Sequence, residues 1–179
     1  MTDPFVLAFV PGVTPAKWIA VWNERMPRTP IELRPVPQDE AMQSLRDGTA
    51  SIGIVRLPVA VDGLSVIPLY GEVTVVVAAR DHPVAAFESL TLADLVGEQL
   101  IDGQDAAAVE LVAASDAVAV MPHSLARLHA RKDVVSRTVS DAPETRVALV
   151  WLEARTTPRV EEFVGIVRGR TANSSRGKR

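Results

Sequence analysis

The first 57 residues alternate short apolar runs with helical patterns, and this alternation constrains the fold more than any other feature of the sequence. The apolar or alternating runs at 5–10, 31–36 and 51–57 predict three strands. Between them, residues 14–26 and 39–46 carry apolar side chains at helical spacing. The resulting order, strand-helix-strand-helix-strand, predicts an α/β fold with mostly parallel sheets and right-handed crossovers.

Turn-forming residues mark the ends of these predicted helices. Thr14 followed by Pro15 is a typical helix start, with a threonine N-cap and proline at the first helical position. Gly48 is expected to end the second helix, since glycine adopts the left-handed conformation of a C-cap without strain.

The rest of the chain continues the α/β pattern. The unbroken apolar run at 73–79 predicts a fully buried strand. Further strands are predicted at 64–70, 99–101, 117–121, 134–139 and 146–151, and further helices near 105–114, 124–131 and 157–167.

Composition excludes several classes of chemistry. The chain has no cysteine, so it has no disulfide, thiol nucleophile or cysteine-ligated metal. Its three histidines lack metal-ligand spacing, and no phosphate-binding or nucleophile-elbow motif occurs. We therefore predict no catalytic residue, no metal and no cofactor, and a binding protein instead of an enzyme.

The N-terminal apolar run is too short for an export signal, and no run approaches the roughly 20 apolar residues that span a bilayer. A cytoplasmic protein without membrane contact is expected.

Several short motifs, in order, resemble the effector-binding (substrate-binding) domain of LysR-type transcriptional regulators. These motifs are Leu-Arg-Asp-Gly at 45–48 leading into Ile-Gly-Ile at 52–54, Gly-Leu at 63–64, Pro-Leu-Tyr-Gly-Glu at 68–72, Asp-His-Pro-Val-Ala at 81–85, and Leu-Thr-Leu-Ala-Asp-Leu at 90–95. The resemblance runs from about residue 5 to residue 167.

This resemblance implies a type II periplasmic-binding-protein-like fold, with two α/β lobes joined by two crossing strands and a small effector in the cleft between them. On that basis lobe one comprises residues 1–68 plus 143–167, and lobe two comprises residues 69–142. It also implies a sensor of small molecules in transcriptional regulation that pairs as a homodimer or with a partner regulator.

The sequence departs from the family in three places. The first predicted strand begins at residue 5, where family members carry an N-terminal winged helix-turn-helix, so we expect a chain without its own DNA-reading domain. The stretch 95–109 is short, so lobe two is expected to be shortened. Ser115 and Ala117 stand where the family has glycines before an apolar strand.

Arg56 is the first candidate for a ligand-binding side chain. It follows a buried-looking strand at a position where the family often has a cationic group near the cleft. A guanidinium there can hold a carboxylate effector through two parallel hydrogen bonds. The alternatives are a surface arginine or an internal ion pair with Glu72 or Asp102.

Further candidates lie where strands end and helices begin, the edge at which open α/β sheets bind ligands. An anionic effector can bind the free N–H groups of a helix N-terminus, although Thr14 can equally serve as a simple N-cap. The candidate residues are Gly12, Val13 and Thr14 in the first loop, Gln38 at the start of the next helix, and Asp102 in the matching loop of lobe two.

Residues 168–179 form a basic tail on a chain whose net charge is −3. Its polar, breaker-rich composition predicts disorder. A weak, salt-sensitive contact with the phosphate backbone of DNA is one interpretation, and a solvated tail is the other. The cations involved are Arg168, Arg170, Arg176, Lys178 and Arg179.

Two other functions fit the same two-lobed fold. A solute-binding transport protein would need an export signal or a lipid-anchored cysteine, and an enzyme would need clustered carboxylates or a cofactor lysine. Neither feature is evident in the sequence, so a regulatory sensor is favoured.

Overall fold

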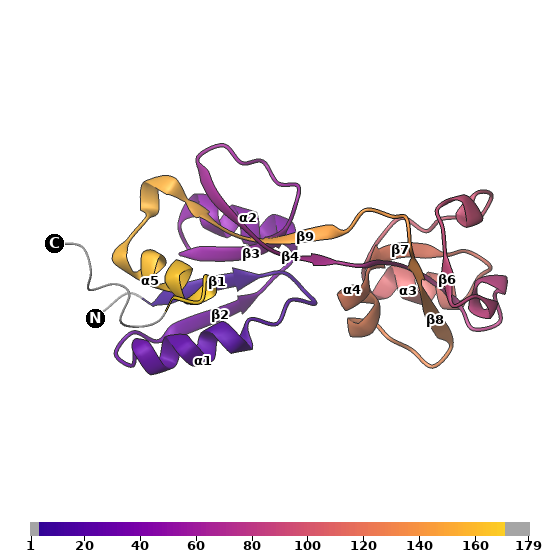
Figure 1. Cartoon of the computed structure of the whole chain (residues 1–179), viewed down its shortest axis with the longest axis horizontal. Helices are drawn as coiled ribbons and strands as arrows, with labels where there is room; N and C mark the ends of the chain where they lie inside the picture. The colour runs from indigo at the N-terminus through magenta and orange to yellow at the C-terminus, as the bar shows by residue number, and fades with distance from the viewer. Residues whose placement is uncertain (1–3, 171–179) are drawn as a thin grey trace. The chain divides into compact units, whose positions relative to one another are not determined.

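The computed structural model describes residues 4–170 and divides the chain into two compact units (Figure 1). Unit 1 contains the described residues up to Leu69 together with those from Ala148 onwards, and unit 2 contains Tyr70–Val147. Unit 1 is therefore built from two separate stretches of sequence, whereas unit 2 is a single stretch.

Unit 1 is organised around a five-stranded sheet of order β2-β1-β3-β9-β4. Strand β1 pairs in parallel with both β2 and β3, with Leu7 opposite Leu33 on one side and Ile52 on the other. The strands are β1 (Phe5–Phe9), β2 (Ile31–Pro35), β3 (Ile52–Arg56), β4 (Leu64–Glu72) and β9 (Thr145–Leu152).

The helices of unit 1 match the predicted ones to within a few residues. Gly48 has a φ of +79° and ends α2, as predicted. The predicted N-cap at Thr14 is wrong: the capping position belongs to Pro15, and no side chain caps α1. The helical elements are α1 (Ala16–Arg25), α2 (Gln38–Asp47), α5 (Pro158–Val167) and the 3-10 turn η3 (Glu153–Arg155).

Three aromatic rings form the centre of the core of unit 1. Phe5 of β1 stacks on Trp22 of α1 at a centroid distance of 4.5 Å, and Phe163 of α5 lies 5.7 Å and 5.8 Å from these two rings. All three side chains are fully buried. The cluster joins the N-terminal and C-terminal stretches of the unit, in a chain where aromatic residues make up only 4%.

Unit 2 contains a four-stranded sheet of order β6-β8-β5-β7. Here β5 runs antiparallel to both of its neighbours, whereas β6 and β8 are parallel. The predicted fold class is confirmed, but this sheet is mixed. The strands are β5 (Thr74–Ala79), β6 (Ser89–Leu90), β7 (Ala119–Pro122) and β8 (Val134–Val139).

Alternate residues of β5 point into two separate apolar clusters, so this strand is buried on both faces, as its apolar run predicts. Val75 and Val77 pack with α3 and α4, and Val76 and Ala78 pack with the two 3-10 turns. The covering elements are α3 (Ala106–Ala113), α4 (His123–Leu128), η1 (Pro83–Ala86) and η2 (Ala93–Leu95).

The stretch between η2 and α3 contributes little to the sheet. The strand predicted at 99–101 is reduced to a single parallel bridge between Leu100 and Val118, and Leu100 is 60% exposed. Two backbone hydrogen bonds, from Ile101 to Val118 and from Val118 to Gln99, hold this segment beside β7.

Ser115 allows the turn before β7 to form without glycine. Its hydroxyl donates to the Leu111 carbonyl oxygen at 2.8 Å and accepts from the Ala117 N–H at 3.3 Å. Among residues 4–170 no non-glycine residue has a positive φ. The turn before β7 is thus formed without a positive φ and is held by hydrogen bonds of the serine side chain.

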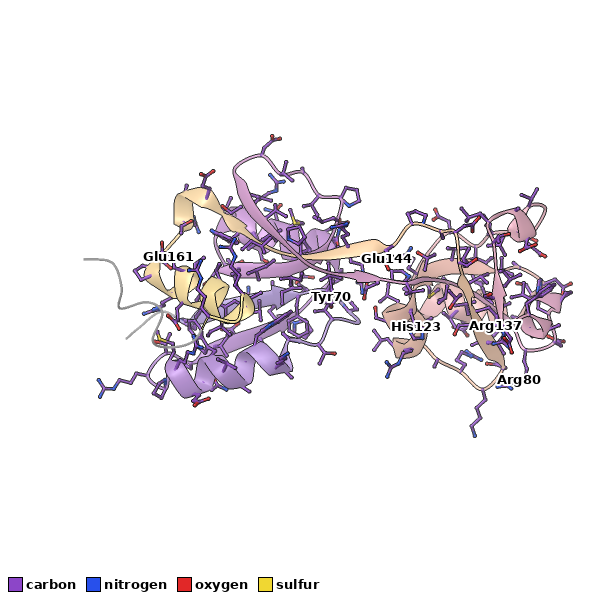
Figure 2. The ribbon with its side chains drawn as sticks, viewed as in Figure 1. Tyr70, Arg80, His123, Arg137, Glu144 and Glu161 are labelled. Carbon is purple, nitrogen blue, oxygen red and sulfur yellow. The ribbon has the colours of Figure 1, made fainter. Side chains whose placement is uncertain are left out.

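A histidine and an arginine side chain hold turns of unit 2. His82 Nδ1 accepts from the Val84 N–H at 3.1 Å, so this histidine shapes the turn at Pro83. Arg80, the residue after β5 (labelled in Figure 2), donates to the Lys132 carbonyl oxygen at 2.7 Å.

The C-terminus of α5 closes with a Schellman motif. Gly169 has a φ of +72°, its N–H donates to the Ile166 carbonyl oxygen, and the Arg170 N–H donates to that of Gly165. Arg168 and Arg170 therefore belong to this folded cap, which corrects the prediction that disorder begins at residue 168. Arg176, Lys178 and Arg179 lie outside the described residues.

We expect Phe163→Ala to lower the free energy of unfolding of unit 1 by about 3–5 kcal/mol, since it opens a cavity in the aromatic cluster. Urea denaturation followed by tryptophan fluorescence measures this, because Trp18, Trp22 and Trp151 all lie in unit 1. Phe87→Ala is the matched control: Phe87 is 51% exposed in unit 2, so the same transition should change by less than about 0.5 kcal/mol. Equal effects of the two changes would contradict the role of the cluster.

Candidate functional site

The loop after β1 presents polar groups at the carboxyl end of the sheet of unit 1. Gly12 turns the chain with a φ of +84°, and the Val13 N–H donates to the Val10 carbonyl oxygen at 3.3 Å. Val13 is buried, whereas Thr14 is exposed. Within the described residues the Thr14 hydroxyl makes no hydrogen bond, so it is available to a ligand.

Gln38 and Arg56 are joined by two hydrogen bonds. The Gln38 side-chain amide donates to the Arg56 carbonyl oxygen at 2.8 Å, and its Oε1 accepts from the Arg56 N–H at 2.9 Å. The first residue of α2 thus clamps the last residue of β3. Because both ends of the Gln38 amide are occupied, its role is to position Arg56 and the start of α2.

Arg56 is almost entirely buried, with a relative exposure of 9%. This overturns the alternative of a surface arginine. It ends a strand whose five residues are all buried, so its guanidinium lies in a region of low dielectric, where hydrogen bonds to a charged group are strong.

The parallel strands bring these residues to one edge. The Val10 N–H donates to the Ile54 carbonyl oxygen, and the Val36 N–H donates to that of Phe9. The carboxyl ends of β1, β2 and β3 are therefore adjacent, and so are the loops that follow them. The candidate residues at this edge are Gly12, Val13, Thr14, Gln38 and Arg56.

Asp102, the remaining predicted ligand residue, belongs to unit 2. It is exposed in the loop between the bridge at Leu100 and α3. The neighbouring Asp105 has a defined structural task, since its carboxylate accepts from the Ala108 N–H at 2.9 Å and caps α3.

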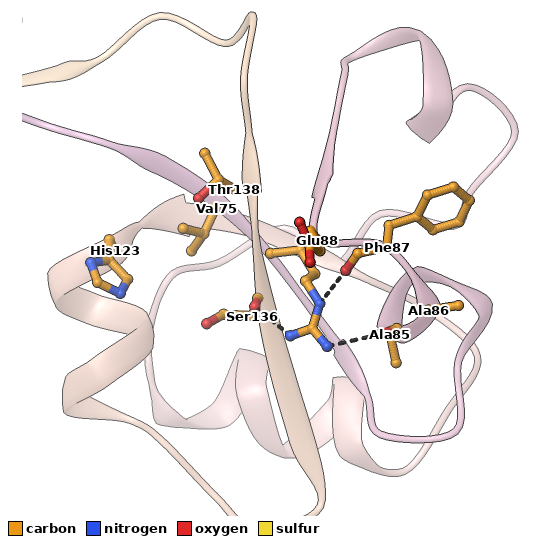
Figure 3. A pocket seen from close by; sticks show the side chains of 9 residues that line it. Val75, Ala85, Ala86, Phe87, Glu88, His123, Ser136 and Thr138 are labelled. Carbon is orange, nitrogen blue, oxygen red and sulfur yellow. Dashed lines mark hydrogen bonds between the residues drawn. The ribbon is translucent and has the colours of Figure 1, made fainter.

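Unit 2 contains a pocket of about 400 Å³ that the sequence did not predict (Figure 3). It lies along β8, with the side chains of Ser136 and Thr138 and the imidazole of His123 among its lining groups. The polar alternation of residues 134–139 was the available signal, because hydroxyl side chains on an inner strand indicate a face that is not fully covered.

Arg137 lines the same pocket but is already engaged. Its guanidinium donates to the carbonyl oxygens of Phe87 at 2.5 Å and Ala85 at 2.8 Å, and so fastens η1 and the residue after it to β8 (Figure 3). The pocket therefore presents hydroxyl and imidazole groups and the carboxylate of Glu88, whereas its arginine is committed to the fold.

Among residues 4–170, no group of three or more His, Asp or Glu side chains is arranged to hold a metal ion. In the same part of the chain no helix is both long and apolar enough to cross a membrane.

A family model for the LysR substrate binding domain matches residues 7–105 and 103–172. The chain belongs to this family. The two matched segments of this LysR substrate-binding domain meet at residues 103–105, within the stretch that was predicted to be shortened.

Individual relatives agree with this assignment. The domain is 22% identical over 187 aligned positions to the Hca operon transcriptional activator HcaR of Escherichia coli K12. This alignment covers 88% of this chain and 63% of HcaR. The chain thus spans less than two thirds of that curated relative.

Solved structures share its fold. The OxyR regulatory domain of Pseudomonas aeruginosa (C199D mutant) superimposes with a TM-score of 0.72 and 21% identity, over 94% of this chain and 96% of that one. The BenM effector-binding domain with its effector benzoate gives a TM-score of 0.75 and 16% identity, over 93% and 90%. The type II periplasmic-binding-protein-like fold is confirmed.

We expect Gln38→Ala to destabilise the carboxyl edge of unit 1 by about 1–3 kcal/mol, because it leaves two half-buried backbone groups without partners. Hydrogen exchange followed by NMR should show the Arg56 amide exchanging about tenfold faster or more. Gln43→Ala, on an exposed position of the same helix, is the control. Unchanged exchange at Arg56 in the Gln38 variant would show that the clamp carries no stability.

Proposed function

We propose that this LysR substrate-binding domain senses a small organic anion, in particular a carboxylate, in the service of transcriptional regulation. The ligand residues would be Gly12, Val13, Thr14 and Arg56, with Gln38 positioning Arg56. Asp102, which the sequence also suggested, belongs to unit 2 and remains a separate candidate for a ligand contact there.

One observation carries the proposal: the N-terminus of α1 presents unused donors at the edge where Arg56 ends β3. Within the described residues, no carbonyl accepts from the N–H groups of Ala16 and Lys17, and the Thr14 hydroxyl is likewise uncommitted. The first turn of α1 contains no acidic residue. Such a helix start attracts negative charge through its free N–H groups and its dipole.

Arg56 supports a carboxylate over a neutral ligand. A nearly buried guanidinium binds a planar carboxylate through paired hydrogen bonds, and the low dielectric around it strengthens them. The family relationship points the same way, since a relative of the same fold, BenM, binds benzoate as its effector.

The regulatory role is proposed in the cytoplasm, as a homodimer or with a partner regulator. Direct contact with DNA would come from the basic C-terminal residues, through phosphate contacts that weaken with salt. A solute-binding transport protein or an enzyme on the same fold is the alternative function, but the matched family and HcaR favour a regulator.

Thr14→Val should lower the affinity for benzoate by roughly tenfold or more, because it removes one hydrogen-bond donor to a charged oxygen. A titration of the full chain, followed by 1H–15N NMR, measures this through the amides of residues 12–14. Thr138→Val makes the same change in the pocket of unit 2 and should leave the affinity unaltered.

The titration also tests the site itself. Benzoate-dependent shifts at residues 12–14 and 56 support the proposed ligand edge. Shifts confined to residues 123 and 136–138 would move the ligand to the pocket of unit 2. If Thr138→Val loses benzoate binding and Thr14→Val keeps it, the ligand likewise belongs in the pocket of unit 2.

A further inference from the structure

A second pocket, with a volume of about 550 Å³, lies at the amino ends of the parallel strands of unit 1, opposite the proposed effector edge. It lies between the start of β1, the segment that follows α2, and the start of α5. Val6 and Ser51, which line it, stand at the amino ends of β1 and β3. None of the predicted ligand residues lines this pocket, so it is separate from the proposed effector edge.

The described residues that line the pocket carry positive charge and no acidic side chain. Arg155 lies just before α5 and Arg159 lies in its first turn, which also contains the acidic residue Glu161. On the α2 side, the carboxylate of Asp47 accepts from the N–H and the hydroxyl of Thr49, a lining residue, at 2.9 Å and 2.7 Å. These bonds lower the pKa of the Asp47 carboxyl.

The guanidinium of Arg155 packs directly against the backbone of Gly48. A Cβ atom at position 48 would lie 1.2 Å from Arg155 Nη1, so the guanidinium can occupy this place only because residue 48 is glycine. Within the described residues, no hydrogen bond from Arg155 is formed. Its charge is attracted to Asp47, but its donors remain available to the pocket.

Two hydroxyl groups in the pocket have unused protons. Ser51 Oγ accepts from the Val6 N–H at 3.1 Å, and Thr157 Oγ1 accepts from the Val160 N–H at 3.3 Å. Neither hydroxyl donates a hydrogen bond within the described residues. Because their oxygen atoms already serve as acceptors, both are oriented to act as donors toward a ligand.

Apolar groups complete the lining. Leu152 is half-buried and Pro158 is exposed, next to the fully buried Phe5 and Leu45. The volume falls in the range of small-molecule sites, which combine an apolar lining with a few convergent polar groups.

We propose that this pocket is a second ligand site, which binds a small organic carboxylate with a compact apolar body. The guanidinium of Arg155 pairs with the carboxylate, the hydroxyls of Ser51 and Thr157 donate to it, and the apolar part rests on Leu152 and Pro158. The site is independent of the proposed effector edge, because it lies at the other ends of the same strands.

A 1H–15N NMR titration of the full chain with benzoate tests this proposal. The amides of Thr49, Ser51, Arg155 and Thr157 should shift in a saturable manner, and Arg155→Gln should weaken this response about tenfold or more. Arg155→Lys, which keeps the charge but loses the planar fork, should give an intermediate affinity.

Two controls define failure. Arg28→Gln removes the same charge from an exposed turn of unit 1 and should leave the affinity within about twofold. Benzamide, which matches benzoate in shape but carries no charge, should bind at least about tenfold more weakly.

The proposal is overturned if about 10 mM benzoate shifts none of the four amides. It is equally overturned if Arg155→Gln binds as the parent does, or if benzamide binds as well as benzoate. The effector edge is monitored by the amides of residues 12–14 and the second site by those of Thr49, Ser51, Arg155 and Thr157. The absence of binding at one site can therefore be distinguished from its absence at the other.

Discussion

The contact among Phe5, Trp22 and Phe163 holds unit 1 together. Each ring comes from a different element. Phe163 lies on α5, which belongs to unit 1 but follows unit 2 in the sequence. Phe5 lies at the amino end of β1, so this cluster of rings fixes the position of β1. The loops at the carboxyl end of β1 and the pocket at its amino end are positioned by the same strand.

The two edges of unit 1 differ in how their charged groups are supported. At the carboxyl edge, the neutral side-chain amide of Gln38 binds both backbone groups of Arg56. Arg56 is almost fully buried. At the amino edge, Arg155 is exposed and rests on Gly48, with Asp47 nearby. The two arginines thus differ in exposure and in their support, which is a backbone clamp for Arg56 and contact with a glycine for Arg155.

Strand and helix positions could be predicted from the sequence because hydrophobic periodicity is a local property. The run at 73–79 identified a buried strand, and Gly48 identified the end of α2. The antiparallel pairing of β5 with both neighbours could not be predicted, since pairing direction is decided by contacts between distant segments. Thr14 was misplaced as an N-cap because local preference does not reveal that Pro15 takes that position. The clamp between Gln38 and Arg56 was likewise invisible, as it joins residues 18 positions apart.

The division of unit 1 into two stretches has a consequence for synthesis on the ribosome. All of unit 2 is encoded between the two stretches, so it can finish folding as soon as its last strand has emerged. Unit 1 is completed later, because β9 and α5 follow unit 2 in the sequence, and until they are made Phe5 and Trp22 lack the third ring of their cluster. Of the two stretches of unit 1, the earlier one is therefore exposed while the whole of unit 2 is being made.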